Sequence, residues 1–259
     1  MRDGFDAPPV VVGGVGGSGT RVVAEMLEGL GIFMGDDLND AHDNLRLARV
    51  FGSMRDRLQT LGQAGTPADP AAASAAAAFV AATLEAFAAA MHDAFLAQHD
   101  RRAGWGWKVP GNHFILAHLA AVFPGLSYIH VIRHGIDMAF SANQNQVRNW
   151  GRHYGVDVDG LPPEQAALAF WIAANRRTVA EARRLGIRFL ILNFDALCRR
   201  PSETAGELLD FLDRPRRDLE SIVRLVSPPA SLGRRTGRDL GFVGAAERAA
   251  LREFGFEPD

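Results

Sequence analysis

The sequence is poor in cysteine: Cys198 is the single one in 259 residues. An internal disulfide is therefore excluded, which is typical of proteins that do not depend on an oxidising compartment. An excess of charge of one sign is also missing, because the formal net charge is −2. The overall charge therefore predicts no binding to nucleic acid or to an anionic lipid surface. Any phosphate group must be bound by a local site.

Strongly hydrophobic runs are scarce as well. Residues 1–9 contain acidic residues and prolines, and no apolar run precedes Val10, so the pattern of a signal peptide is absent. The Ala-rich stretch 71–90 includes Ser74 and Glu85, and alanine is only weakly apolar, which makes it a poor membrane span. No group of residues has the spacing of metal ligands. We predict a cytoplasmic protein with no membrane span and no metal site.

Short apolar runs alternate with helical patterns along the chain. The runs typical of buried strands are 10–12, 126–133 and 187–192, and helices are expected between them, including one from Gly135 to about Arg148. Strands separated by helices imply parallel pairing. We therefore predict a single domain over residues 1–259 with a P-loop-like, three-layer α/β fold, in which helices flank a central, mainly parallel sheet.

A glycine-rich segment, Gly13–Arg21, lies between the first predicted strand and a helix. Glycines allow the backbone to approach an anion closely, and the N-terminus of a helix favours negative charge. Four interpretations fit this segment. Gly14, Gly16 and Gly19 match the dinucleotide fingerprint GxGxxG, for which Asp36 or Asp37 would be the ribose ligand. A Walker A loop would need lysine where Thr20 stands.

The third interpretation is a loop for a 5′-phosphosulfate group, and the fourth is a turn without a ligand. A second motif separates these possibilities. The strand 126–133 ends in Arg133, and Ser141 follows eight positions later on the predicted helix. A residue at the carboxyl end of a parallel strand faces the ligand crevice, and a guanidinium matches phosphate oxygens.

Together the two motifs resemble those of sulfotransferases that use 3′-phosphoadenosine-5′-phosphosulfate (PAPS). The segment 107–110, Trp-Lys-Val-Pro, is similar to a Lys-x-Pro element of bacterial, tyrosylprotein and carbohydrate sulfotransferases, and 232–240 resembles their C-terminal Gly-Arg region. The resemblance implies transfer of a sulfuryl group to a hydroxyl or amine of an unknown acceptor. It also implies a set of residues that bind PAPS: Gly16, Gly17, Ser18, Gly19, Thr20, Arg21, Arg133, Ser141 and Arg234, with Arg235 as an alternative to Arg234.

The sequence departs from the family at one catalytic position. Gly17 stands where most sulfotransferases carry a lysine or arginine, so another cation must stabilise the departing phosphate. We predict Lys108 for this role, with Arg21 second. The acceptor hydroxyl needs a base, and the acidic segment 34–43 supplies candidates. Asp43 is the first choice and Asp37 the second, and Asp40 and His42 are the others in this segment; His113, near Lys108 in the sequence, is a further possibility.

Two alternatives remain open at this stage. One is an NAD(P)-binding oxidoreductase built on the GxGxxG segment. The other is a non-catalytic nucleotide- or glycan-binding protein on a sulfotransferase scaffold. The Ala-rich helix expected over 70–98 is a candidate insertion over the acceptor side, although its apolar stripe of Phe79, Leu84, Phe87 and Met91 is also typical of ordinary core.

Overall fold

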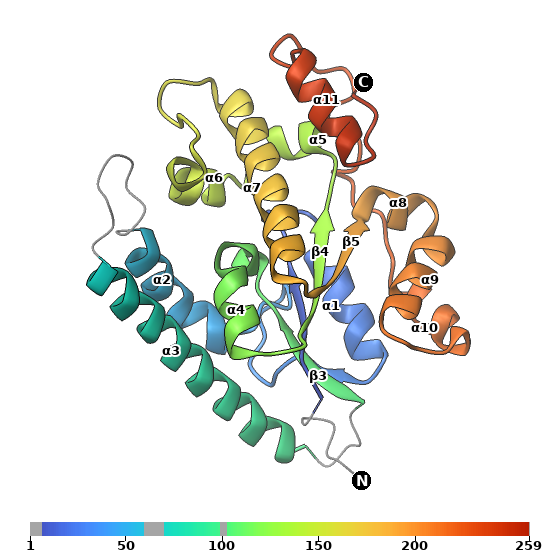
Figure 1. Ribbon diagram of the computed structural model, residues 1–259. Coiled ribbons are helices and arrows are strands. Elements are labelled where there is room, and N and C mark those ends of the chain that lie inside the picture. Colours follow the sequence, from blue (N-terminus) through green and yellow to red (C-terminus); the bar gives the residue numbers. More distant parts are fainter. Residues whose placement is uncertain (1–6, 60–69, 99–102, 259) are drawn as a thin grey trace.

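The chain forms a parallel β-sheet of five strands in a computed structural model that describes residues 7–59, 70–98 and 103–258 (Figure 1). The strand order is β2-β3-β1-β4-β5, and every neighbouring pair is parallel. The strands are β1 (Val10–Gly13), β2 (Ile32–Phe33), β3 (Gly104–Lys108), β4 (Ser127–Ile132) and β5 (Arg188–Asn193). The three predicted strands are confirmed as β1, β4 and β5.

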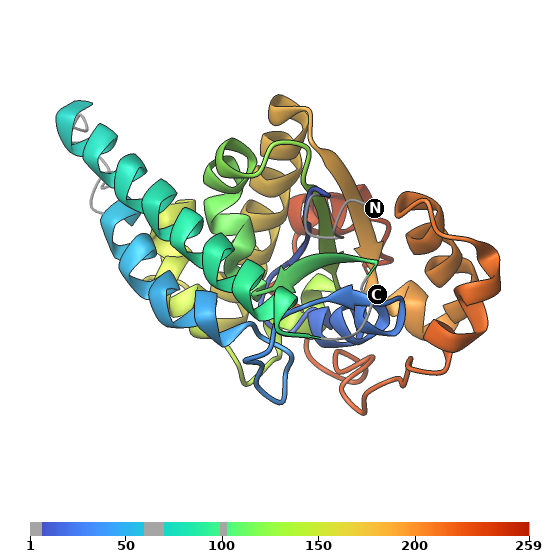
Figure 2. The same cartoon turned by 90° about the horizontal axis from the view of Figure 1, so that it is seen from below.

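Helices connect the strands and cover both faces of the sheet (Figures 1 and 2). The α-helices are α1 (Thr20–Gly29), α2 (Leu45–Gln59), α3 (Pro70–Leu96), α4 (Leu116–Val122), α5 (Gly135–Ala139), α6 (Asn145–Trp150), α7 (Pro163–Leu185), α8 (Phe194–Arg199), α9 (Pro201–Phe211), α10 (Leu219–Val223) and α11 (Ala245–Glu253). Short 3₁₀ helices lie at η1 (Pro110–Ile115), η2 (Gly151–Tyr154) and η3 (Arg216–Asp218).

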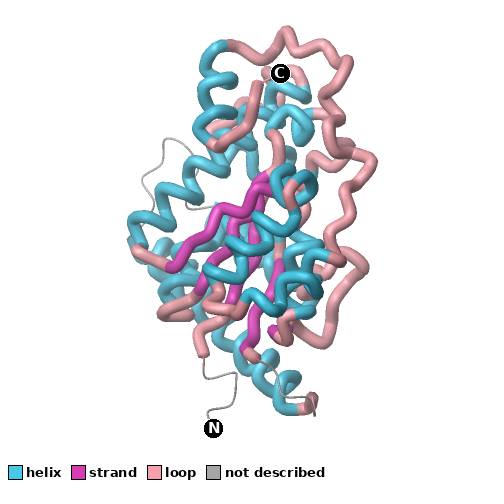
Figure 3. Tube along the Cα trace, turned by 90° about the vertical axis from the view of Figure 1, so that its right-hand side faces the viewer, coloured by secondary structure: helices cyan, strands magenta, loops and turns pink. Residues whose placement is uncertain are grey.

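The sheet separates two hydrophobic clusters, because successive side chains of a strand point to opposite faces. In β1, Val12 packs with the cluster that contains α1, α8 and α9, whereas Val11 packs with the larger cluster that contains α4 and α7. In β4, Ile129 packs with the cluster that contains α1, α8 and α9, and Tyr128 packs with the larger cluster. Figure 3 shows the strands enclosed by helices on either side. The predicted three-layer α/β arrangement is therefore confirmed.

Helix α3 packs along α2, on the outer side of the molecule (Figure 2). The predicted apolar stripe is largely core, since Leu84, Phe87 and Met91 are buried. By length and composition alone α3 is the one described helix that would reach across a membrane, and 28% of its most apolar stretch is buried. In the sequence, Asp69 followed by Pro70 is typical of an N-cap and first-turn pair for this helix, but Asp69 lies outside the described residues.

The expected helix from Gly135 to about Arg148 is interrupted. Helix α5 ends at Ala139, and α6 begins at Asn145. The cause is Gln144, whose side-chain amide donates hydrogen bonds to the carbonyls of Met138, Ala139 and Ser141 at 3.0, 3.2 and 2.8 Å. A side chain that binds the last carbonyls of a helix competes with the next helical turn.

Candidate active site

The glycine-rich loop joins the end of β1 to the start of α1. Gly17 and Gly19 have φ angles of +96° and +92°, which side-chain-bearing residues rarely adopt. A Cβ on Gly19 would also lie 2.2 Å from the ring of Phe194. Both the backbone conformation and the packing therefore require glycine at position 19.

The loop leaves several backbone donors available. The N–H groups of Gly17 and Gly19 have no acceptor among the described residues, and Gly19 caps α1 without a side-chain hydrogen bond. The N–H of Gly16 donates to Gln146 Oε1 at 3.0 Å. The Ser18 side chain is buried, and its Oγ donates to the Val15 carbonyl at 2.5 Å, so this residue shapes the loop from within. Free N–H groups at a helix N-terminus form an anion site.

Arg133 follows β4 directly and is buried. Its Nη2 donates to the carbonyl of Ser231 and to Ser231 Oγ at 3.1 Å, and its Nη1 donates to the Gly17 carbonyl at 3.5 Å. Its Nε has no hydrogen-bond partner within the described chain. The Phe194 ring lies 5.5 Å from the guanidinium carbon. Arg133 is thus held beside the glycine-rich loop with donor capacity to spare.

Lys108 ends β3 and is almost completely buried, with 1% of its side chain exposed. Its Nζ contacts Asp43 Oδ1 and the carbonyl of Ala41. Burial lowers the pKa of Lys108, and the neighbouring Asp43 carboxylate partly offsets this effect. The two residues form an ion pair within the site, although they are separated by 65 positions in the sequence.

One cavity brings most of the predicted residues together. Its volume is about 400 Å³, and it lies at the carboxyl ends of β1, β3 and β4, where open α/β sheets bind ligands. The predicted residues that line it are Gly16, Gly17, Gly19, Thr20, Arg21, Asp43, Lys108 and Arg133. Ser227, Pro229 and Ser231 close the cavity from the C-terminal segment.

Other predicted residues lie elsewhere. Asp37 forms an ion pair with Arg49 at 2.6 Å and does not line this cavity. Ser141 follows α5 instead of standing on a continuous helix, and its Oγ accepts a hydrogen bond from the Asn143 N–H at 3.3 Å. Arg234 Nη1 donates to the Asp137 carbonyl at 3.4 Å.

The histidines among the candidate bases have other partners. His42 Nδ1 lies 3.1 Å from Glu28 Oε2. Burial lowers the pKa of His113 to about 3, assisted by His130, so this imidazole is neutral and a weak base at pH 7. His113 Nδ1 lies 2.8 Å from the Tyr154 hydroxyl, which is a structural contact outside the loop cavity.

Sequence reasoning missed Asp137 as an anchor of the C-terminal segment. Its fully buried carboxylate accepts hydrogen bonds from the Gly233 N–H at 2.7 Å, the Arg235 N–H at 3.0 Å and Arg235 Nη1 at 3.2 Å. Burial opposes its ionisation, but the donors of Arg235 and Gly233 outweigh burial and lower the pKa of Asp137. Asp137 therefore fixes the segment whose Ser231 contacts Arg133.

Replacing Asp137 with asparagine should destabilise the protein by about 2 kcal/mol, or roughly 4–8 °C in Tm, because one buried acceptor becomes a donor facing N–H groups. Thermal unfolding at pH 7 measures the loss. A lowered folded-state pKa means that the contribution of the carboxylate is complete above about pH 5 and is lost progressively as the pH falls below the unfolded-state pKa and through the folded-state pKa. Asp210→Asn is the control, because Asp210 pairs with Arg216 on the surface. Equal effects of the two variants would contradict the anchoring role.

The strand order argues against the dinucleotide interpretation. In the dinucleotide fold, the second strand lies beside the first and ends at the acidic ribose ligand. Here β3 lies between β2 and β1. Asp36 and Asp37, the expected ribose ligands, form ion pairs with Arg46 and Arg49 instead.

The described residues also contain no group of three or more His, Cys, Asp or Glu able to hold a metal ion.

The chain is thus an α/β protein with a cavity at the carboxyl ends of its strands, lined by the glycine-rich loop, Lys108 and Arg133. The profile of the sulfotransferase family matches residues 8–218, and the chain belongs to that family. Its fold is similar to the sulfotransferase domain from the curacin biosynthetic pathway, with a TM-score of 0.54 and 12% identity over 97% of this chain and 99% of that domain. It is also similar to a sulfotransferase from Mycobacterium avium, with a TM-score of 0.50 and 15% identity over 96% of this chain and 77% of that chain.

At these identities the solved structures show likeness of fold alone. No curated protein matches the sequence. The predicted family and fold class are therefore confirmed, and the predicted donor, acceptor and site residues are the subject of the proposals below.

Proposed function

We propose that the protein transfers the sulfuryl group of PAPS to a hydroxyl or amine of an acceptor molecule. The observation that carries this proposal is the cavity in which free backbone N–H groups, Arg133 and Lys108 converge. The backbone N–H groups follow β1 and the Arg133 guanidinium follows the neighbouring parallel strand β4. Two such sets of donors suit a ligand that carries two separate phosphate groups.

The residues present fit the nucleotide. The N–H groups of Gly17 and Gly19 and the start of α1 would hold the 5′-phosphosulfate. Arg133 would hold the 3′-phosphate through its guanidinium. The oxygens of Ser231 now lie against Arg133 Nη2, and phosphate oxygens are acceptors of the same kind. We expect the segment from Ser227 to Arg235 to change position when the nucleotide binds, because the phosphate would replace Ser231 at Arg133. Arg234 would then close over the nucleotide.

Ser141 is assigned to the 3′-phosphate by the resemblance, and this assignment stays a prediction. The residue follows Arg133 by a short helix and a turn. Its Oγ accepts a hydrogen bond and keeps its own O–H free to donate among the described contacts.

Transfer requires stabilisation of charge and removal of a proton. PAPS supplies an activated sulfuryl group, whose loss leaves negative charge on the 5′-phosphate. Lys108 is the enclosed cation that would stabilise this charge, and Arg21 lies at the more exposed rim with 63% of its side chain exposed. Asp43 is the proposed base for the acceptor, since it lines the same cavity as Lys108. Asp37 is less favoured because it pairs with Arg49.

Nucleotide selectivity tests the proposal directly. Thermal unfolding would be measured with 3′-phosphoadenosine-5′-phosphate (PAP), 5′-AMP, ATP and NAD at matched concentrations. A ligand at about 100 times its Kd adds about 2.7 kcal/mol of stability, or roughly 5–11 °C in Tm. We expect PAP to protect most strongly. Protection by NAD and none by PAP would instead support an oxidoreductase and overturn the proposal.

The expected location and surroundings of the protein also stay predictions. We propose a cytoplasmic enzyme whose partners are the nucleotide donor and the acceptor, with no nucleic acid partner. The net charge of −2 supports the last point, because it gives no general attraction to polyanions.

A further inference from the structure

A second cavity adjoins the first at the glycine-rich loop. Its volume is about 250 Å³. Gly16, Pro110 and Asn143 line both cavities, so the two spaces meet at these residues. A group at this junction would lie between the second cavity and the loop that is proposed to hold the phosphosulfate.

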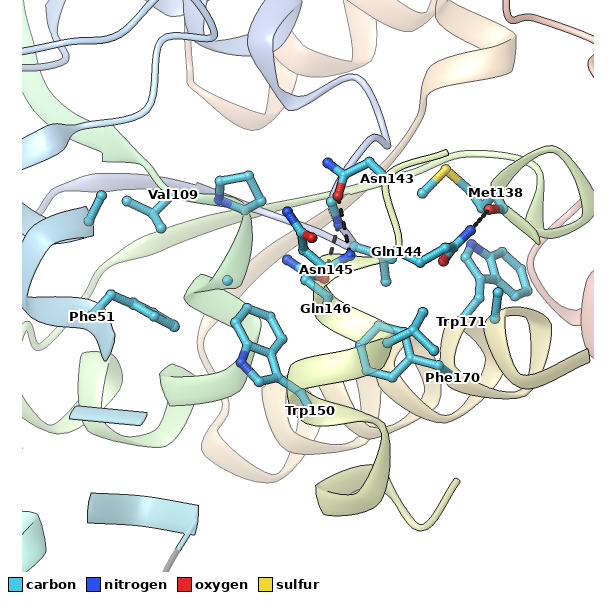
Figure 4. Close-up of a pocket in the computed structure, with 17 residues that line it drawn as sticks. Phe51, Val109, Met138, Asn143, Gln144, Asn145, Gln146, Trp150, Phe170 and Trp171 are labelled. Atoms are coloured by element: carbon cyan, nitrogen blue, oxygen red, sulfur yellow. Dashed lines mark hydrogen bonds between the residues drawn. The ribbon is translucent and has the colours of Figure 1, made fainter. Parts of the chain in front are cut away.

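The walls of the second cavity are aromatic. Phe51 comes from α2, Trp150 from the end of α6, and Phe170 and Trp171 from α7 (Figure 4). The Phe51 and Trp150 rings lie 5.8 Å apart at an angle of 42°, so they form one continuous apolar side. Flat apolar groups gain most from such walls, both through burial of area and through ring contacts.

Charge is missing from this cavity. None of its 17 lining residues is acidic, basic or a histidine. A charged substituent would leave water without gaining a counter-ion, which is strongly unfavourable. The nucleotide cavity differs, because Arg21, Lys108 and Arg133 line it.

The polar side-chain groups of the lining residues are the indole N–H groups of Trp150 and Trp171 and the amides of residues 143–146. The Trp171 indole donates to the Arg133 carbonyl, and the buried Trp150 indole has no partner among the described residues. The amide nitrogen of Gln144 is used by the carbonyls at the end of α5, and Gln146 Oε1 accepts from the Gly16 N–H. Asn143 Oδ1 accepts from the Asn145 N–H at 3.2 Å. The Nδ2 of Asn143 and the Nε2 of Gln146 have no hydrogen-bond partner among the residues that the structure describes. These neutral donors can orient one hydroxyl oxygen without charging the cavity.

The volume limits the size of the occupant. A cavity of about 150 Å³ holds one benzene ring. A volume of 250 Å³ with an open junction therefore suits a ring system of about two fused six-membered rings. A folded sugar unit of similar volume would leave most of its hydroxyls against aromatic walls without hydrogen-bond partners.

We propose that this cavity is the acceptor site, and that the acceptor is an uncharged ring alcohol or phenol. Its rings lie among Phe51, Trp150 and Phe170, and its hydroxyl lies at the junction near Asn143. The inference rests on the proposed function. The acceptor oxygen forms a bond to sulfur, the bond between sulfur and the 5′-phosphate oxygen breaks, and the hydroxyl proton passes to a base. The products are a sulfate ester and PAP.

The test compares 2-naphthol with 6-hydroxy-2-naphthoate, which has the same rings and an added carboxylate. Binding is measured by equilibrium dialysis without nucleotide, and transfer is measured with PAPS. We expect 2-naphthol to bind at least about 10-fold more tightly and to be converted to its sulfate ester. Equal binding of the two probes would overturn the proposal, as would binding of 2-naphthol without transfer by a protein that PAP protects.

A cavity-filling variant locates the site. Ala48 lines this cavity from α2, is half-buried and does not line the nucleotide cavity, so Ala48→Phe fills the acceptor space. We expect at least a 10-fold loss of 2-naphthol binding with an unchanged stabilisation by PAP. Ala86→Phe, on the exposed side of α3, is the control and should keep both properties. Unchanged 2-naphthol binding in Ala48→Phe would place the acceptor elsewhere.

Failure of the acceptor-site proposal and failure of the proposed function give different experimental results. If the acceptor-site proposal is wrong and the proposed function is right, PAP still protects the protein against thermal unfolding. If PAP does not protect the unaltered protein, the proposed function fails, and the assignment of this cavity to an acceptor fails with it, even where 2-naphthol still binds.

Discussion

Replacing Lys108 with methionine should lower the kcat of sulfuryl transfer by about 10²–10³-fold, the usual cost of removing one pre-positioned charge or donor from a transition state. Gly17 supplies no side chain beside the phosphosulfate loop, and the ammonium of Lys108 is the buried cation that lines the cavity together with Arg133. An enclosed charge acts through a lower effective dielectric than an exposed one and is therefore worth more. The affinity for PAPS should change less than kcat, since the full charge of the leaving phosphate develops only during transfer. PAP already carries that charge on its 5′-phosphate, so its affinity should fall as well.

Steady-state kinetics with 2-naphthol or another accepted alcohol measure kcat, and binding of PAPS in the absence of acceptor measures the ground-state affinity separately. Asp43→Asn is the matched variant, because it removes the carboxylate partner of Lys108 and leaves the lysine side chain in place. If Asp43 is the base, it too should lower kcat, and the double variant should cost less than the sum of the two losses. Arg21→Ala tests the exposed cation and should have a smaller effect.

Lys108 also allows a test that needs no substitution. It is the single lysine of the sequence, since every other residue in the Lys+Arg count of 28 is an arginine. Amine acylation followed by peptide mass analysis therefore reports on one ε-amino group. We expect PAP to slow acylation of Lys108. A Lys108→Met protein that keeps full kcat would exclude the catalytic role, and a wild-type protein that binds PAP but transfers to no alcohol or amine would be the non-catalytic binder considered above.

The parts of this fold that follow from local patterns are predictable from sequence. Val10–Gly13 and Ser127–Ile132 are β-branched or apolar runs bounded by glycine or arginine, and each is a buried strand as predicted. The glycine-rich segment requires positive φ angles at Gly17 and Gly19, and glycine is the residue that adopts them readily. These features are encoded by a few neighbouring residues.

Contacts between distant segments were harder to predict. The insertion of β3 between β1 and β2 brings Lys108 beside Asp43, and no local pattern encodes that register. The single lysine of the sequence was an available indication that was not used. The local sequence around Asp137 gives no sign of its role, because its fully buried carboxylate binds Gly233 and Arg235 from a distant segment.

The interruption after α5 shows the same limit at shorter range. Helical spacing carries apolar residues past Ala139, but the Gln144 side chain binds three carbonyls and ends the helix. The resulting turn places Asn143 at the junction of the two cavities. A propensity pattern that would continue the helix thus gives way to side-chain hydrogen bonds that build the site.

Replacing Arg133 with alanine should remove the preference of the protein for PAP over 5′-AMP. Arg133 now donates to Ser231 and to the Gly17 carbonyl, and its Nε has no partner among the described residues. A 3′-phosphate would accept from this guanidinium, and hydrogen bonds to a charged group contribute about 1.5–3 kcal/mol, or roughly 10–100-fold in Kd. 5′-AMP lacks the 3′-phosphate, so its affinity should be nearly unchanged.

The measurement is the Kd of each nucleotide by calorimetry, with the Tm of each unliganded variant recorded alongside. Arg133→Lys keeps one positive charge but loses the planar fork of donors, so it should fall between the wild type and Arg133→Ala. Arg49→Ala is the control, because Arg49 pairs with Asp37 outside the cavity and should leave both affinities unchanged. Parallel losses for PAP and 5′-AMP in Arg133→Ala would assign Arg133 to the shape of the loop and not to the 3′-phosphate. Retention of 5′-AMP binding with a selective loss of PAP would place the 3′-phosphate at the carboxyl end of β4.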